Sequence, residues 1–330
     1  MDLSNLFART SLYRACRDFP LVALDVGSRN GFDRALEPVA FAVDVVGFEP
    51  DPVECARLQR AADGAKGLWR SQRHICAALS GSGGPRKLGI PISPESASLL
   101  EHDPKVGQAF GMSAMFDVAR VIDVDTMTMD EALASHAVAP PHYIKMDIEG
   151  AELEVFASAR VGLERALAIK TEVSFIPMRR NQPLATDVDL VLRERGFVLV
   201  DLQAPIHWRR HSYVSHPQLA RDKIPYSRGQ LAQGDYLYFR HPDRIESTDV
   251  ASSVRAAVLA MAFGHFDYAH ALLTRPTVAT HFRQAYDSDV TACVQEVSLA
   301  FGRRVWMGEF ATHLRRIVTF LRSARVAGSG

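Results

Sequence analysis

The chain has 330 residues, of which 47% are hydrophobic and 23% charged, enough for one large domain or two modest ones. Lysine and arginine together number 38, as do aspartate and glutamate, so the formal net charge is zero. This balance argues against a nucleic-acid-binding protein with a broad basic face. The densest basic spots, Arg179–Arg180 and Trp208–His211, are typical of solvated surface charge, although either could line a local basic pocket.

Cysteine spacing and hydropathy bear on the cellular compartment. The four cysteines form no Cys-x-x-Cys pair, so the sequence suggests neither a zinc site nor a disulfide framework. Residues 1–16 contain no apolar signal core, and no apolar run approaches the roughly 18 residues of a membrane span. We therefore expect reduced thiols, no transmembrane segment and a cytoplasmic location.

Strands and helices are predicted to alternate along the first half of the chain. Asp51 and Pro52 favour a helix start, because aspartate suits the N-cap and proline the first helical position. The run 21–26 is apolar, compact and followed by glycine, as expected of a strand buried on both faces. In order, we expect a lead-in helix over 3–17, strands over 21–26 and 43–48 separated by a helix over 31–39, and short strands over 73–79, 86–92 and 119–125.

The alternation continues through the second half. Thr128 and Glu131 form a capping-box pattern, which predicts a helix start. This rhythm is typical of a parallel, doubly wound α/β sheet. The last two strands have no helix between them, so we expect an antiparallel pair at one edge. The remaining predicted elements are strands over 142–147, 167–173, 197–201 and 235–240, with helices over 149–159 and 187–195.

From about residue 248, glycines become sparse and helical periodicity takes over. We therefore expect a Rossmann-like domain over 1–247 and a small helical region over 248–330. That region could form a homodimer, cap an acceptor site or dock a partner. Its apolar residues recur at helical spacing in three stretches: Val254, Val258 and Met261; Val290, Val294, Val297 and Phe301; and Phe310, Leu314, Ile317 and Leu321.

The segment DVGSRNG, residues 25–31, lies between a predicted strand and a predicted helix. Gly27 and Gly31 permit a sharp turn and close approach to a ligand, and a helix N-terminus favours a carboxylate or phosphate. Glu49 ends the next strand, where an acidic residue can hold a ribose diol. A nucleoside-type ligand is indicated; the alternative is an ordinary turn with a capping acid.

Two features of this loop distinguish between nucleoside ligands. The third glycine of a G-x-G-x-x-G motif is missing, which disfavours nicotinamide cofactors. Asp25 would repel a pyrophosphate but tolerates the cationic amino acid tail of S-adenosylmethionine.

The segment YIKMDIEGAE, residues 143–152, is the densest motif. Asp147 ends a predicted strand and Glu149 opens a helix, at the sheet edge where ligands bind in open α/β folds. If the strand order resembles that of methyltransferases, Glu172 lies beside them. The three carboxylates could accept the proton of an acceptor hydroxyl, or hold Mg²⁺ that acidifies it. Helix-dipole stabilisation by Glu149 and Glu152 is the structural alternative.

The segments DVGSRNG, GFEPDP, ICAALSGSGG, VIDVDTMTMDEAL and YIKMDIEGAELEVF resemble the FkbM-type methyltransferase family over roughly residues 21–202. IKMDIEGAE is the most specific part, whereas Arg29 stands where the family usually has asparagine. The resemblance implies a class I methyltransferase fold that uses S-adenosylmethionine. By position it implies Asp25, Gly27 and Gly31, with Ser28 in the same loop, for the methionine part; Glu49 for the ribose; Ala77 and Ala78 near the adenine; and Asp147 and Glu149 near the methyl group.

The reaction implied is direct in-line O-methylation of a hydroxyl on a sugar, glycan or natural product, with Asp147, Glu149 and Glu172 as catalytic candidates and Mg²⁺ as an optional cofactor. We expect a small-molecule or glycan acceptor and no nucleic acid. Two alternatives stay open: an NAD-dependent oxidoreductase, and a catalytically idle scaffold that acts through its helical region.

Overall fold

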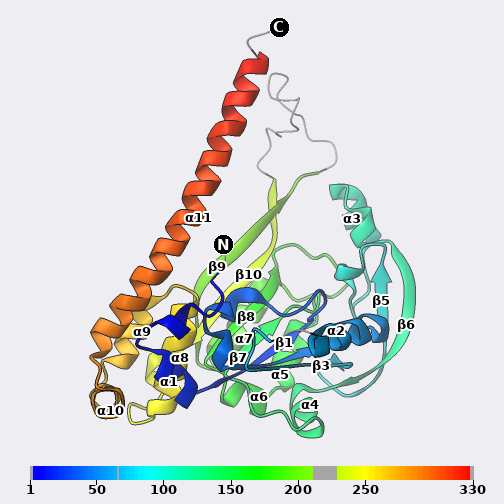
Figure 1. Ribbon diagram of the computed structural model, residues 1–330. Coiled ribbons are helices and arrows are strands. Elements are labelled where there is room, and N and C mark those ends of the chain that lie inside the picture. Colours follow the sequence, from blue (N-terminus) through cyan, green and yellow to red (C-terminus); the bar gives the residue numbers. More distant parts are fainter. Residues whose placement is uncertain (1–2, 65–66, 211–228, 328–330) are drawn as a thin grey trace.

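The computed structural model describes residues 3–64, 67–210 and 229–327. Its centre is a seven-stranded sheet in the order β3-β2-β1-β7-β8-β10-β9 (Figure 1). The first five strands in this order pair in parallel, and β10 is antiparallel to both of its neighbours, as predicted. The strands are β1 (Leu21–Val26), β2 (Val43–Phe48), β3 (Ser71–Ile75), β7 (Tyr143–Met146), β8 (Ala168–Ser174), β9 (Phe197–Trp208) and β10 (Gln230–Arg240).

The apolar runs of β1 and β2 supply both faces of the sheet. Leu21 and Ala23 belong to one buried cluster, whereas Leu24 and Val26 belong to another on the opposite face. Alternate side chains of a strand point to opposite faces, so a strand covered on both sides must be apolar almost throughout.

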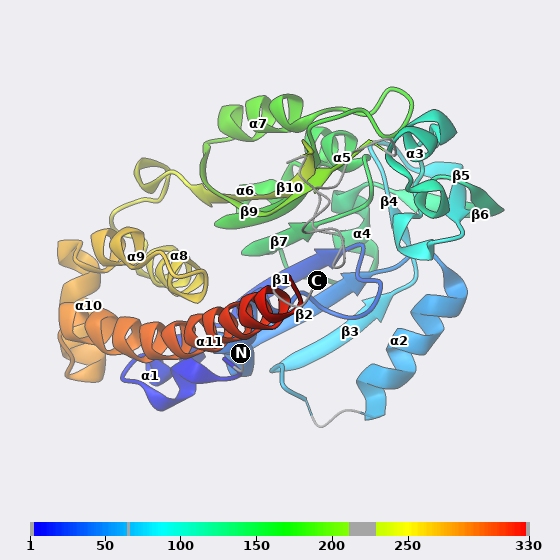
Figure 2. The ribbon, with the colours of Figure 1, turned by 90° about the horizontal axis from the view of Figure 1, so that it is seen from above.

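Two groups of helices cover these faces (Figure 2). One apolar cluster joins β1 and β2 to the N-terminal elements and the C-terminal helices: η1 (Leu6–Arg9), α1 (Tyr13–Asp18), η2 (Arg34–Ala42), α8 (Val250–Ala262), α9 (Phe266–Leu273), α10 (Pro276–Tyr286) and the start of α11 (Val290–Ala327). The other cluster includes α4 (Met129–Ser135), α5 (Glu152–Ser158), α6 (Val161–Glu164) and α7 (Ala185–Glu194).

A second, three-stranded sheet, in the order β4-β6-β5, lies beyond the carboxyl ends of β1, β2 and β3 (Figure 2). Phe116, Met178 and Trp208 form a small apolar cluster next to it, which ties this outer sheet to the end of β9. The elements in and around this second sheet are β4 (Ala78–Leu79), β5 (Gly84–Pro91), η3 (Pro94–Ser96), α3 (Pro104–Phe110), η4 (Ser113–Met115) and β6 (Val118–Met127). Two elements remain: helix α2 (Pro52–Gly64), which leads to β3, and the short 3₁₀ turn η6 (Pro242–Arg244), which follows β10.

Local sequence signals predicted two helix starts correctly. The amide of Val53 donates to Asp51 Oδ1 at 3.0 Å, so Asp51 caps α2. Thr128 and Glu131 form the reciprocal capping box at the start of α4. Both interactions satisfy backbone donors that have no partner within the helix.

Three predicted helices differ from the structure. The lead-in helix is divided into η1 and α1, and the helix expected over 31–39 is a 3₁₀ segment that contains Pro38. The helix expected from Glu149 begins only at Glu152. Glu149 and Gly150 have φ values of 60° and 109°, in the left-handed region that an α-helix cannot use.

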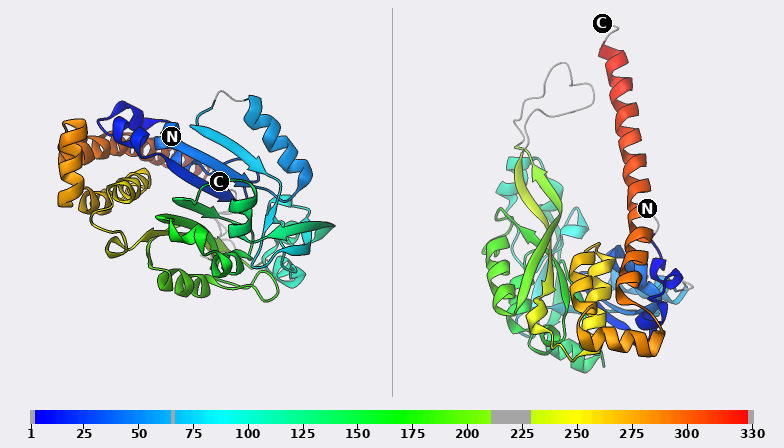
Figure 3. Two further views of the ribbon diagram at one scale, coloured as in Figure 1. Left: turned by 90° about the horizontal axis from the view of Figure 1, so that it is seen from below. Right: turned by 90° about the vertical axis from the view of Figure 1, so that its left-hand side faces the viewer.

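The C-terminal helices share a continuous core with the sheet. Val254 and Val258 of α8 lie in the same buried cluster as Leu21 and Leu237. The last two periodic stretches of the sequence form a single helix, α11, of 38 residues. Its first turns pack against the helices and strands that form this core, and the rest of the helix extends away from them (Figure 3, right). The division near residue 248 as a folding boundary stays a prediction.

Within residues 3–64, 67–210 and 229–327, none of the helices combines the length and the apolar character needed to span a bilayer.

Candidate functional site

A cavity of about 160 Å³ lies at the carboxyl ends of β1, β2 and β7. The expected site residues that line it are Gly27, Glu49, Ala77, Ala78, Asp147 and Glu149. Asp25, Ser28, Gly31 and Glu172 are not in its lining and contact the lining residues or their neighbours instead. The two halves of the site that the sequence predicted separately therefore meet in one place.

Gly27 makes the close approach between the first loop and the second motif. Its φ is +84°, and a Cβ built on it would lie 1.8 Å from the carbonyl oxygen of Asp147. Gly31 also has a positive φ, of +104°, but its Cβ would meet nothing within 4 Å. Gly27 is thus required by both conformation and space, and Gly31 by conformation alone.

Ser28, whose contact with the methionine part stays a prediction, directs its side chain toward the strands behind the loop. Its buried hydroxyl lies 3.0 Å from Nδ1 of His74 on strand β3, across the intervening strand β2. Both groups press against Gly47, where a Cβ would lie 2.5 Å from His74 Nδ1 and 2.6 Å from Ser28 Oγ. Burial lowers the pKa of His74 to about 4, so the imidazole is neutral and supports the loop from behind.

Glu49 lies at the end of β2 and is 3% exposed. Its Oε1 accepts a hydrogen bond from the amide of Asp51 at 2.9 Å and lies 3.6 Å from the guanidinium of Arg29. Burial raises the pKa of Glu49, although the Asp51 amide and Arg29 oppose the rise. Arg29, which departs from the family pattern, also pairs with Asp51 at 3.0 Å and so fixes the turn after β2.

Lys145 is a site residue that the sequence reasoning missed. It is the register partner of Asp25 on the adjacent strand. Its Nζ lies 3.3 Å from Asp25 Oδ1 and 3.2 Å from Asp147 Oδ2, and it donates to the carbonyl of Gly27 at 3.1 Å. Burial opposes the charge of Lys145, but Asp147 and Asp25 outweigh it and raise the pKa of the ammonium.

Asp25 is almost fully buried behind the loop. Its Oδ2 accepts a hydrogen bond from the amide of Asp33 at 2.6 Å, whereas its Oδ1 faces Lys145 without a well-oriented hydrogen bond. Burial raises the pKa of Asp25 to about 6, against the effect of Lys145. The loop therefore contains a carboxylate oxygen that a further cation could use.

The predicted carboxylate cluster is present. One oxygen from each of Asp147, Glu149 and Glu172 lies within 4.8 Å of the others. Burial and the neighbouring carboxylates, Glu149 and Asp147, raise the pKa of Glu172 well above its ordinary value, and Gln233 donates to its Oε1 at 2.9 Å. Asp147 is the more accessible member, with a side chain 38% exposed.

Arg179 holds Glu149 in place and was also missed. Its Nη2 lies 2.5 Å from Glu149 Oε2, and its side chain is 3% exposed. The expectation of solvated surface charge is therefore wrong for Arg179, although it is right for Arg180, whose side chain is 65% exposed. Burial raises the pKa of Glu149 even so, with Arg179 opposing and Asp147 reinforcing the rise.

Glu152 stabilises the turn that presents these acids. Its Oε1 accepts hydrogen bonds from the amides of Ile148 and Gly150, at 3.0 and 3.1 Å. It thereby satisfies donors in the left-handed stretch before α5, whereas the helix-dipole role considered for this residue stays a prediction.

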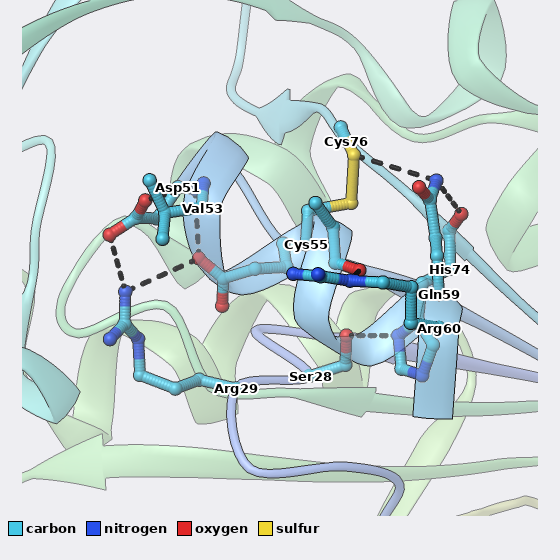
Figure 4. The surroundings of a disulfide bond; sticks show 11 residues. Ser28, Arg29, Asp51, Val53, Cys55, Gln59, Arg60, His74 and Cys76 are labelled. Atoms are coloured by element: carbon cyan, nitrogen blue, oxygen red, sulfur yellow. Dashed lines mark hydrogen bonds and ion pairs between the residues drawn. A yellow bond between two sulfur atoms is a disulfide. The ribbon is translucent and has the colours of Figure 1, made fainter. Parts of the chain in front are cut away.

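The prediction that no disulfide is present is wrong. Cys55 of α2 and Cys76, directly after β3, are bonded, with Cα atoms 5.6 Å apart (Figure 4). Gln59 donates to the carbonyl of His74 at 3.1 Å beside the bond. Spacing along the chain did not reveal the pair because α2 and β3 are brought together only by tertiary packing. A cytoplasmic location remains a prediction, and reduced cysteines no longer support it.

The strand order, the antiparallel edge and a glycine loop facing an acid at the end of β2 define a Rossmann-like class I methyltransferase fold. A family model described as the methyltransferase FkbM domain matches residues 25–199. The chain therefore belongs to the FkbM methyltransferase family, as the sequence resemblance indicated.

Among solved structures, similar chains include methyltransferase FkbM from Methylobacillus flagellatus KT, with 17% identity, a TM-score of 0.36, and coverage of 67% of this chain and 43% of that one. Magnesium protoporphyrin IX methyltransferase from Synechocystis PCC 6803, with bound S-adenosylmethionine, has 11% identity, a TM-score of 0.33, and coverage of 72% and 78%. The chain spans less than half the length of the first of these proteins. No curated protein sequence matches it.

Proposed function

We propose that this protein is an S-adenosylmethionine-dependent methyltransferase that O-methylates a hydroxyl of a small molecule or glycan. The observation that carries the proposal is that Gly27, Glu49, Ala77 and Asp147 line one and the same cavity. It combines a close backbone approach, an acid at the end of β2 and an apolar wall, which together suit a nucleoside.

The residues present fit this cofactor. A loop with no room for a Cβ at Gly27 allows close backbone contact, and Asp25 Oδ1 offers an acceptor without a well-oriented hydrogen bond. In this proposal Glu49 holds the ribose hydroxyls, Ala77 and Ala78 lie along the adenine, and Lys145 pairs with the carboxylate of the methionine part. When bound, the cofactor supplies an electrophilic methyl group on a positively charged sulfur.

We assign proton acceptance from the acceptor hydroxyl to Asp147. It lines the cavity, and it is the most accessible carboxylate of the cluster. Glu149 is engaged by Arg179, and the raised pKa of Glu172 favours its protonated form. These two residues would orient the acceptor by hydrogen bonding, while the site as a whole aligns the two reactants.

A Mg²⁺ ion on the same three carboxylates is a weaker proposal. Binding a cation there would require Glu172 to lose its proton and Glu149 to turn from Arg179. Activity that is unchanged in a chelator would support the metal-free assignment, whereas activity lost in chelator and restored by Mg²⁺ would reverse it.

Titration calorimetry with S-adenosylmethionine and S-adenosylhomocysteine tests the cofactor assignment. We expect micromolar binding by the wild type and at least a tenfold weaker affinity for Glu49→Ala, since a buried ribose contact is removed. Asp147→Asn should bind normally but turn over about 100-fold or more slowly, the range for general-base loss. Absence of binding by either nucleoside would overturn the proposal.

A further inference from the structure

The outer part of α11 carries an apolar stripe that the residues described by the structure leave uncovered. The helix packs against the rest of the described fold as far as Phe301, whose ring centroid lies 5.6 Å from that of Phe266 in α9. Beyond it the helix projects away from the sheet and the other helices, as Figure 1 and the right-hand view of Figure 3 show. Six large apolar side chains between residues 306 and 318 are 39–66% exposed: Trp306, Met307, Phe310, Leu314, Ile317 and Val318.

These side chains form one face of the helix. At about 100° per residue they fall within an arc of about 120°. Met307, Phe310, Leu314 and Ile317 follow the alternating three- and four-residue spacing of the a and d positions of a coiled coil. A regular seam of this kind is the pattern by which one helix packs along another, and it is self-complementary between two identical helices.

The charged residues of the segment favour a protein partner over a lipid surface. Arg304, Arg315 and Arg316 lie about 100° or more from the midline of the stripe, on the opposite side of the helix. Arg303 lies near the midline itself, one turn before Trp306. On a membrane Arg303 would be carried toward the hydrocarbon at a large cost, whereas at the open end of a helix pair it can reach water.

The exposed area is adequate for a dimer. At about 150–250 Å² for a large, fully exposed side chain, the six residues present on the order of 600 Å² per copy. Standard protein interfaces begin at about the same area per partner. Patches of this size seldom remain exposed on soluble monomers.

We propose that residues 306–318 of α11 pair with the same segment of a second copy of this chain, so that the protein is a homodimer joined through its projecting helices. The pairing is independent of the methyl-transfer site, since none of the six residues lines the cavity.

Sedimentation velocity and light scattering on the full chain test this proposal. The wild type should be a dimer across the micromolar range. Leu314→Arg places a charge in the seam of both copies and should weaken dimerisation at least about 100-fold, equivalent to about 2.8 kcal/mol at 1.4 kcal/mol per tenfold. Thr312→Arg adds the same charge on the opposite face and should leave the dimer intact. Circular dichroism and cofactor titration should be unchanged in both variants.

Three outcomes would overturn the proposal. One is a wild type that is monomeric at the highest concentration measured. Another is a dimer that survives both Leu314→Arg and the double variant with Ile317→Arg. The third is a monomer that co-sediments with vesicles of phosphatidylserine and phosphatidylcholine and loses that binding in Leu314→Arg, which would assign the stripe to a lipid surface.

Discussion

Replacement of Gly27 by alanine tests the closest contact of the site. The added Cβ would lie 1.8 Å from the carbonyl oxygen of Asp147, so the β1 loop and the end of β7 must separate by at least about 1.2 Å to reach the 3.0 Å that real Cβ contacts respect. The left-handed φ of +84° adds about 1–2 kcal/mol of backbone strain. Overpacking adds about 1–3 kcal/mol more.

Gly31→Ala is the matched control, because it imposes similar backbone strain with no atom within 4 Å of the new Cβ. In urea unfolding we expect Gly27→Ala to lower the free energy of unfolding by about 2–5 kcal/mol and Gly31→Ala by about 1–2 kcal/mol. A displacement near 1 Å between Gly27 and Asp147 should also reduce turnover about 100-fold. Equal destabilisation by the two variants, or normal turnover in a folded Gly27→Ala protein, would refute this reasoning.

Two further predictions concern the walls of the same cavity. The pKa of Asp25 rises on folding from 3.8 to about 6, so the folded state binds the proton more tightly and this group lowers stability as pH increases through that interval. Affinity for the cationic cofactor should instead increase from pH 5 to pH 7 as Asp25 ionises, and calorimetry should find this increase abolished in Asp25→Asn. The Cys55–Cys76 bond closes a loop with a sequence separation of 21, so its reduction should lower the free energy of unfolding by about 3 kcal/mol. Reduction should also weaken cofactor binding, because Cys76 adjoins Ala77 in the cavity wall; wild-type affinity in Cys55→Ser/Cys76→Ser would contradict that link.

The parts of the site that the sequence predicted depend on local or strictly periodic signals. The apolar run of β1 with the glycines that follow it identifies the loop, and the acids after β7 lie at the same sheet edge because parallel strands end together. The contact between Gly27 and Asp147 is the direct result of that rule. The helix caps at Asp51 and Thr128 could also be predicted from the sequence, since each involves residues at most three positions apart.

The parts that were missed depend on register and burial. Lys145 lies within the segment YIKMDIEGAE, but its pairing with Asp25 follows from the register between β1 and β7, which the sequence does not specify. Arg179 and Arg180 are adjacent and chemically identical, yet one side chain is 3% exposed and the other 65%. Composition could not separate a buried partner of Glu149 from a solvated charge.

For α11 too, the sequence predicts an apolar face but does not show what covers it. The apolar spacing at Val290, Val294 and Val297 resembles that at Phe310, Leu314 and Ile317, and both patterns predict a helix with one covered face. The first stretch is buried against the body, whereas the second is more than half exposed. A periodic pattern specifies that a face is to be covered but not by what. Because the described part of the chain leaves the outer face of α11 open, a regular seam of this length is best satisfied by its own copy.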